Sequence, residues 1–158
     1  MSIMEISKLR TIGEGISVVA VLVTLVFLIL EVRENTAAIR TESFGESINK
    51  LNEWRLNLAG NGELAQMFAD FNDGAVMELD RAERQQFGLV MTSLWSIYES
   101  AYFAQSYGTL GESEWSRFER VLCSQYGSAV AFKDGLWDTE VQMILSPEFR
   151  LFVEEQCG

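Results

Sequence analysis

Carboxylates are the side chains of this sequence best suited to chemistry, because the chain has 23 Asp and Glu residues and no histidine. The absence of histidine excludes histidine-based acid–base catalysis, Ser–His triads and His-ligated zinc, di-iron or haem centres. The best single candidate is Glu99, which falls among four aromatic residues of one predicted helix: Trp95, Tyr98, Tyr102 and Phe103. An apolar setting disfavours a charged carboxylate, so Glu99 is a candidate perturbed acid.

A structural role for Glu99 is the alternative interpretation. In that case the carboxylate lies at the edge of a core and bonds to a tyrosine or to a basic residue such as Arg117 or Arg120. The four tryptophans favour this view, because aromatic side chains at helical spacing more often form a core than a ligand cage.

Motifs that carry chemistry are missing from the sequence. There is no P-loop, G-x-G-x-x-G fingerprint, nucleophile elbow or EF-hand loop. The tripeptides Asn72-Asp73-Gly74 and Lys133-Asp134-Gly135 are typical of turns and lack the regularly spaced acids of a calcium loop. We therefore expect no catalytic residue, cofactor or metal site, and a protein that is not an enzyme.

The charge of the chain is concentrated in its larger part. Residues 1–40 carry four basic and four acidic side chains, so the net charge of −11 falls on residues 41–158. An acidic domain repels phosphate backbones, which argues against a nucleic-acid partner. The two cysteines, Cys123 and Cys157, do not have a metal-type spacing. We expect two unpaired, partly buried thiols, with a disulfide as the alternative if the domain faces an oxidising compartment.

Residues 15–30 form an apolar run without any charge, bracketed by Glu14 and Glu31. As a helix this run is about 24 Å long, and Ile12 and Val32 extend it toward the roughly 30 Å of a bilayer core. A cleaved signal peptide fits less well, because charged residues occupy the place of its cleavage site. A buried core helix fits less well too, because the run is apolar all round. The sequence predicts a tail over residues 1–11, a transmembrane helix over 12–33 and an acidic domain over 34–158.

The polar residues of the predicted span share one helical face. Together with Val21 and Leu28 they recur at alternating spacings of three and four, and we call the polar members of this set the polar seam: Glu14, Ser17, Thr24, Glu31 and Asn35. Small polar residues on one stripe favour close helix–helix contact in lipid, so the seam predicts an oligomer. Alternatively, the hydroxyls bond to their own helix backbone and the glutamates mark the two membrane interfaces. A pore lined by the seam is the extreme form of the oligomer.

The remaining sequence predicts helices only. One long helix is expected over residues 12–59, because no helix breaker precedes Gly60-Asn61-Gly62. Shorter helices are expected over 63–71, over 81–107 after a capping box of Asp80 and Glu83, and over 112–126 before Gly127. Residues 128–145 are expected to be helical in part, and Ser146-Pro147 predicts the start of a last helix ending near residue 156. The fold class is therefore all-α, with a bundle of four to six helices after the span.

Several short motifs together resemble a broad group of small uncharacterised single-span bacterial membrane proteins. The span is led by Gly13-Glu14 and closes in Glu31-Val32-Arg33-Glu34-Asn35-Thr36. Further similar pieces follow at Tyr98-Glu99, Gly108-Thr109-Leu110, Trp115 and 146–150. The resemblance implies a short outside N-terminus and a cytoplasmic domain, although Lys8 and Arg10 depart from the uncharged start usual in the group. It implies no activity.

These observations predict a non-enzymatic, membrane-anchored helical protein that acts by assembly. It would be a homo-oligomer or an accessory subunit of a membrane complex, with the lipid bilayer and a membrane protein as its partners. A small homo-oligomeric channel is the alternative. The expected location is the bacterial inner membrane. Basic residues near the two ends of the span are almost balanced, so the positive-inside rule does not decide its orientation.

Overall fold

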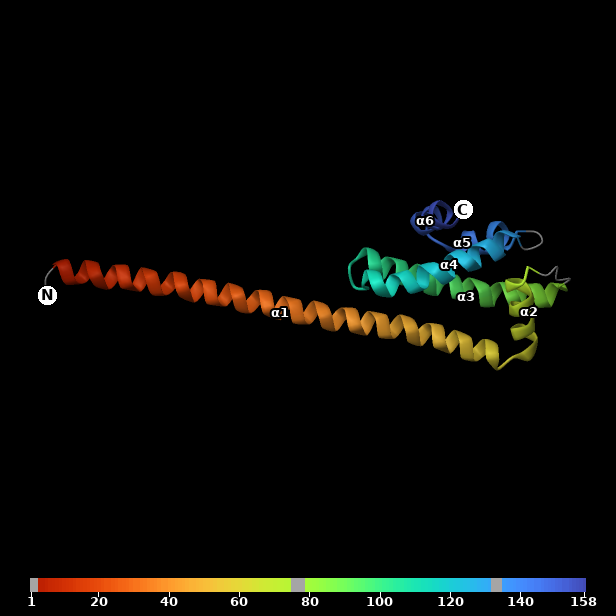
Figure 1. Cartoon of the computed structure of the whole chain (residues 1–158), viewed down its shortest axis with the longest axis horizontal. Helices are drawn as coiled ribbons and strands as arrows, with labels where there is room; N and C mark the ends of the chain where they lie inside the picture. The colour runs from red at the N-terminus through yellow and green to blue at the C-terminus, as the bar shows by residue number, and fades with distance from the viewer. Residues whose placement is uncertain (1–2, 75–78, 132–134) are drawn as a thin grey trace. The chain divides into compact units, whose positions relative to one another are not determined.

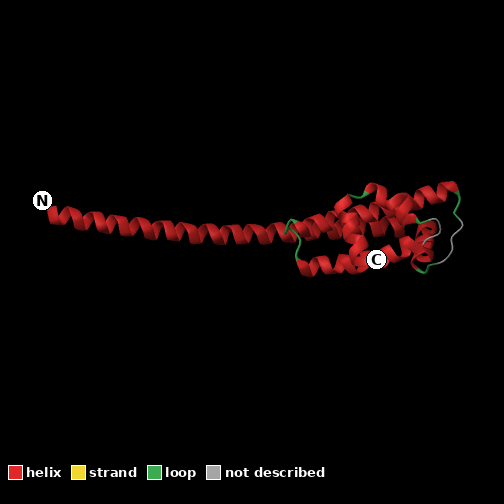
Figure 2. Ribbon diagram, turned by 90° about the horizontal axis from the view of Figure 1, so that it is seen from above, coloured by secondary structure: helices red, strands yellow, loops and turns green. Residues whose placement is uncertain are grey.

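The computed structural model describes residues 3–74, 79–131 and 135–158, with side chains from Ser17 onward except that of Val18. The described residues form helices and no strand, as the sequence predicts (Figures 1 and 2). The helices are α1 (Ile3–Ala59), α2 (Gly62–Asn72), α3 (Arg81–Ser106), α4 (Glu112–Ala131), the π-helix η1 (Trp137–Val141), α5 (Gln142–Ile144) and α6 (Pro147–Cys157). The chain divides into two compact units, Met1–Ile39 and Arg40–Gly158.

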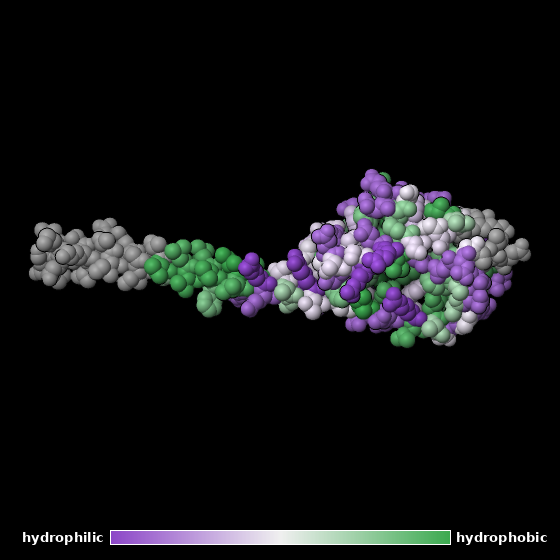
Figure 3. Space-filling view, in the orientation of Figure 1, coloured by the Kyte–Doolittle hydropathy of each residue, from purple (hydrophilic) through white to green (hydrophobic). Residues whose placement is uncertain are grey.

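The first unit consists of the N-terminal part of α1, a helix without an internal breaker. Its large apolar side chains from Val19 to Val32 are exposed, with Phe27 at 71%. Figure 3 shows this stretch as a continuous hydrophobic band that ends where charged residues begin. No helix has a stretch that is long and apolar enough to cross a membrane among the residues described. The all-helical fold is confirmed, and the transmembrane helix stays a prediction.

The second unit is a helical bundle around a core of large apolar side chains. Helix α4 contacts α2, α3, η1 and α6, and α3 also contacts η1. The most deeply buried side chains come mainly from α3 and α6: Phe87, Met91, Leu94, Trp95, Tyr98, Phe149 and Val153. Their spacing of three and four residues gives each helix one apolar face, as an amphipathic helix requires. This packing positions the side chains considered below.

Local capping explains where the helices of the bundle begin. Asp80 Oδ1 accepts the N–H groups of Ala82 and Glu83 at 2.7 and 2.9 Å, and Glu83 Oε2 accepts the Asp80 N–H at 2.7 Å. This confirms the predicted capping box. Ser146 caps α6, which has Pro147 in its first turn. These residues satisfy N–H groups that have no partner within their own helix.

Two predicted helix bounds are wrong. Helix α1 begins at Ile3, whereas the sequence predicts a start near residue 12. Helix α4 continues through Gly127 to Ala131, whereas the sequence predicts an end before Gly127. Glycine lowers helix propensity by only about 1 kcal/mol, and the burial of the apolar side chains of Leu122 and Ala129 on either side offsets that cost. The helices predicted over 63–71, 81–107 and 147–156 are confirmed to within one residue at each end.

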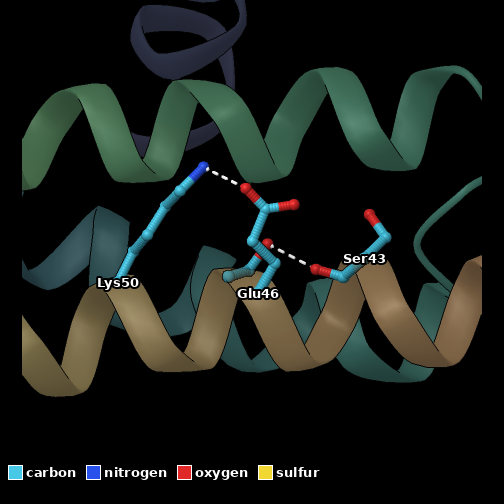
Figure 4. Close-up of polar contacts among 4 residues, drawn as sticks. Ser43, Glu46 and Lys50 are labelled. Atoms are coloured by element: carbon cyan, nitrogen blue, oxygen red, sulfur yellow. Dashed lines mark hydrogen bonds and ion pairs between the residues drawn. The ribbon is translucent and has the colours of Figure 1, made fainter.

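Hydrogen bonds from side chains to distant residues fix the C-terminal part of α1 within the bundle. The Trp54 indole N–H donates to the Val90 carbonyl of α3 at 2.9 Å. Arg40 Nε donates to the Gly108 carbonyl at 2.9 Å, in the turn between α3 and α4. Gly108 has a positive φ of 73°, a conformation that glycine adopts at little cost. Figure 4 shows the ion pair between Lys50 and Glu46 on the same stretch of α1, 2.7 Å long.

Candidate functional site

The polar seam lies on a continuous helix, as its spacing requires. The side chain of Glu14 lies outside the described residues. Glu31 and Asn35 are exposed, and so is Ser17. The Thr24 hydroxyl donates to the Ala20 carbonyl at 2.9 Å, a bond to its own helix. A bond from the hydroxyl to its own helix backbone is what we expect for Thr24 if the seam is not a contact face. The role of the seam in assembly stays a prediction.

Glu99 is half-buried and has a partner that the sequence does not reveal. Its Oε1 accepts the backbone N–H of Ser146 at 2.6 Å. Ser146 is the N-cap of α6, so the carboxylate of α3 holds the first residue of the last helix. A short bond of this kind to a charged acceptor is strong and directional. Glu99 therefore positions the start of α6. The partner predicted for its carboxylate was a tyrosine or an arginine, and the partner in the structure is a backbone N–H instead.

The aromatic residues around Glu99 form a packed cluster that joins α3, α4 and α6. The Tyr102 ring lies 4.7 Å from the Phe152 ring and 6.0 Å from the Trp115 ring, measured between centroids. Deeper in the bundle, the rings of Trp95 and Trp137 are 5.0 Å apart. Three of the four tryptophans are buried. The prediction that aromatic residues build the core is confirmed.

A disulfide joins Cys123 of α4 to Cys157 at the end of α6, with a Cα–Cα distance of 4.9 Å. The expectation of two unpaired thiols is therefore wrong. The spacing of 34 residues gives no hint of the pairing. It becomes possible because α4 and α6 pack against each other, which brings the two backbones within the range that a disulfide bridges.

Groups of three or more acidic or cysteine side chains that could hold a metal ion are absent from the part of the chain that the structure describes. Carboxylates are numerous there, but they are spread over the surfaces of separate helices.

Two adjoining cavities open between α1, α2, α3 and α4 within the second unit. Their volumes are about 300 and about 210 Å³, and four residues line both: Leu51, Arg55, Tyr98 and Val121. No pattern in the sequence marks this site. Its residues come from four helices and share no motif, so only the packing of the bundle brings them together.

Comparisons of the chain with protein-family models, with curated proteins and with solved structures found no match. The resemblance to small single-span bacterial membrane proteins therefore stays a prediction.

Proposed function

We propose that this chain is a membrane-anchored helical protein that acts by assembly rather than by catalysis. Residues 12–33 of α1 are its anchor, and the helical bundle is the domain that the anchor holds at the membrane. The observation that carries the proposal is the exposed apolar surface of α1, where the large side chains from Val19 to Val32 are about half exposed or more.

The distribution of this surface favours lipid as its cover. Burial of one such side chain stabilises a protein by about 1.5–3 kcal/mol, so a run of them left in water is strongly unfavourable. Val21, Phe27 and Leu30 point in different directions around the helix, and all three are exposed. Docking against one protein face covers one side of a helix only, whereas lipid surrounds it.

Assembly is supported by the position of the seam within this surface. Thr24 and Glu31 lie on one face of an otherwise apolar helix. Small and polar residues on one face are favoured where helices meet in lipid, because they allow close approach. The partner on that face is a second copy of the chain or a helix of another membrane protein.

The disulfide supports a location of the bundle on the oxidising side of the membrane. Disulfides persist in the periplasm and outside the cell and are rare in the cytosol. The resemblance described above implies a cytoplasmic domain instead. We propose the opposite orientation in a bacterial inner membrane, because the bond between Cys123 and Cys157 is a property of this chain.

The test combines fractionation with substitutions in the helix. The full chain should remain with membranes after washing with carbonate and should enter solution only with detergent. Thr24→Leu on the seam should change the oligomer, whereas Val26→Leu, about 200° away around the helix, is the matched control and should not. Recovery of the chain in the aqueous fraction refutes the anchor. Equal oligomers for both variants refute the seam as the contact face.

A further inference from the structure

A groove on the bundle combines apolar walls with a few polar and charged side chains, as small-molecule sites do. It consists of the two adjoining cavities described above, and we call it the Tyr98 groove after one of the four residues that line both. It lies wholly within the unit Arg40–Gly158, so the inference does not depend on the membrane anchor. Its larger cavity, about 300 Å³, is at the lower end of the roughly 300–1,000 Å³ of small-molecule sites.

The walls of the Tyr98 groove are apolar. Helix α1 contributes Leu51, Trp54 and Leu58. Phe68 of α2 and Leu94 of α3 line the larger cavity, and Phe118 of α4 lines the smaller one. A groove with such walls takes an aliphatic or aromatic body, because burial of apolar surface on both sides is favourable.

Two arginines give the groove a positive charge in a strongly acidic chain. Arg55 lines both cavities and Arg117 lines the smaller one. Among the described residues, neither guanidinium has a carboxylate oxygen within 4 Å, although the charge of Arg117 acts on Glu114, three residues before it on α4. Arg55 donates to Asn52 Oδ1 at 3.4 Å, which uses one of its five N–H donors. A guanidinium binds a carboxylate through two parallel hydrogen bonds, so arginines at the groove favour an acidic head group.

The interior of the groove adds polar groups that are out of reach of water. Tyr98 is 2% exposed, and burial raises its pKa by more than the nearby Arg55 lowers it, so its hydroxyl keeps its proton at neutral pH. Gln125 is 6% exposed. Its Nε2 donates to Asn72 Oδ1 at 2.7 Å, while its buried Oε1 has no hydrogen-bond partner. Because Asn72 Nδ2 donates to the Phe68 carbonyl, the orientation of both amides is fixed. This oxygen can accept a hydrogen bond only from a donor, which an ionised carboxylate does not have, so Gln125 is a polar part of the wall and does not bind an acidic head group.

We propose that the Tyr98 groove binds a single-chain anionic amphiphile, with the apolar chain along Leu51 and Trp54 and a carboxylate head at Arg55 and Arg117. The apolar walls select the tail, and the two arginines select an acid over a neutral alcohol of the same length. The cavities are too small for a lipid with two acyl chains.

Photochemical labelling of the full chain in phosphatidylcholine nanodiscs tests this directly. The probe is dodecanoate that carries a diazirine near the end of its chain. We expect label in peptides from residues 48–59 and 94–125, and loss of that label when unlabelled dodecanoate is in excess. Dodecanol should compete about tenfold less well, because it lacks the charge. Label confined to residues 17–39, or equal competition by the alcohol, overturns the proposal.

Substitutions with matched controls separate the groove from general hydrophobic attraction. Val121→Trp fills the groove and should abolish the competed label, whereas Val130→Trp on the same helix should not. Both valines are partly exposed, at 42% and 49%, so neither substitution disturbs the core. Arg117→Met should weaken labelling about tenfold, and Arg120→Met, also exposed on α4, should leave it unchanged. Circular dichroism confirms that each variant is folded. Undiminished labelling of Val121→Trp overturns the proposal.

Discussion

Loss of the disulfide should destabilise the bundle by an amount that follows from its place in the chain. The bond closes a segment of 34 residues between α4 and α6. In the chain-entropy account, a loop of that length is worth about 4 kcal/mol, between about 3 for 15 residues and about 4.7 for 100. Measured losses often fall below this value, so we expect a decrease of about 2–4 kcal/mol in the free energy of unfolding when the bond is absent.

The assay is urea unfolding of the full chain in nanodiscs, followed by circular dichroism with and without a phosphine reductant. With a slope near 2 kcal/mol per molar urea, the midpoint should fall by about 1–2 M on reduction. The double variant Cys123→Ser, Cys157→Ser is the control, since it should unfold at the lower midpoint and should not respond to the reductant. Equal midpoints for the oxidised and reduced chain would refute the reasoning. So would alkylation of both cysteines before any reductant is added.

Three further changes test other contacts. Glu99→Ala should lower the free energy of unfolding by about 1–3 kcal/mol in urea unfolding, because the Ser146 N–H loses its acceptor, and Glu99→Gln should restore most of it. Asp80→Ala should cost about 0.5–2 kcal/mol in the same assay, with Asp80→Asn as the conservative control that keeps a capping oxygen. The hydrogen bond and charge of Lys50 lower the pKa of Glu46 from its ordinary value of 4.5. The ion pair therefore contributes a small stabilisation above pH 4.5, which is lost as the pH falls through the lowered pKa. Carbon NMR titration of Glu46 should show a midpoint below 4.5 that rises in Lys50→Met.

Local signals in the sequence were sufficient to predict most of the helices. Asp80 with Glu83, and Ser146 with Pro147, mark helix starts through contacts within four residues, and both starts are confirmed. Gly127 does not end α4, because the effect of a glycine in a helix depends on packing across the bundle, and the neighbouring sequence does not reveal that packing.

The candidate sites depend on contacts between distant residues, and there the sequence was less informative. Glu99 was identified as unusual, but its partner is a backbone N–H from 47 residues later, which no side-chain pattern marks. Arg55 and Gln125 had no distinguishing neighbours in the sequence. Only the folded bundle distinguishes them: it places Arg55 at the groove, and it buries Gln125 with an Oε1 atom that has no hydrogen-bond partner.

The central claim is that α1 anchors an assembling protein in a membrane, and the mass of the extracted particle tests it most directly. The full chain would be released from washed membranes with detergent and weighed by native mass spectrometry. The account predicts a discrete oligomer, or a defined complex with another membrane protein. Flux measurements in liposomes, with Glu14→Gln as the variant, would then separate a scaffold from a pore. A monomer in detergent would contradict assembly, and recovery of the chain without detergent would contradict the anchor.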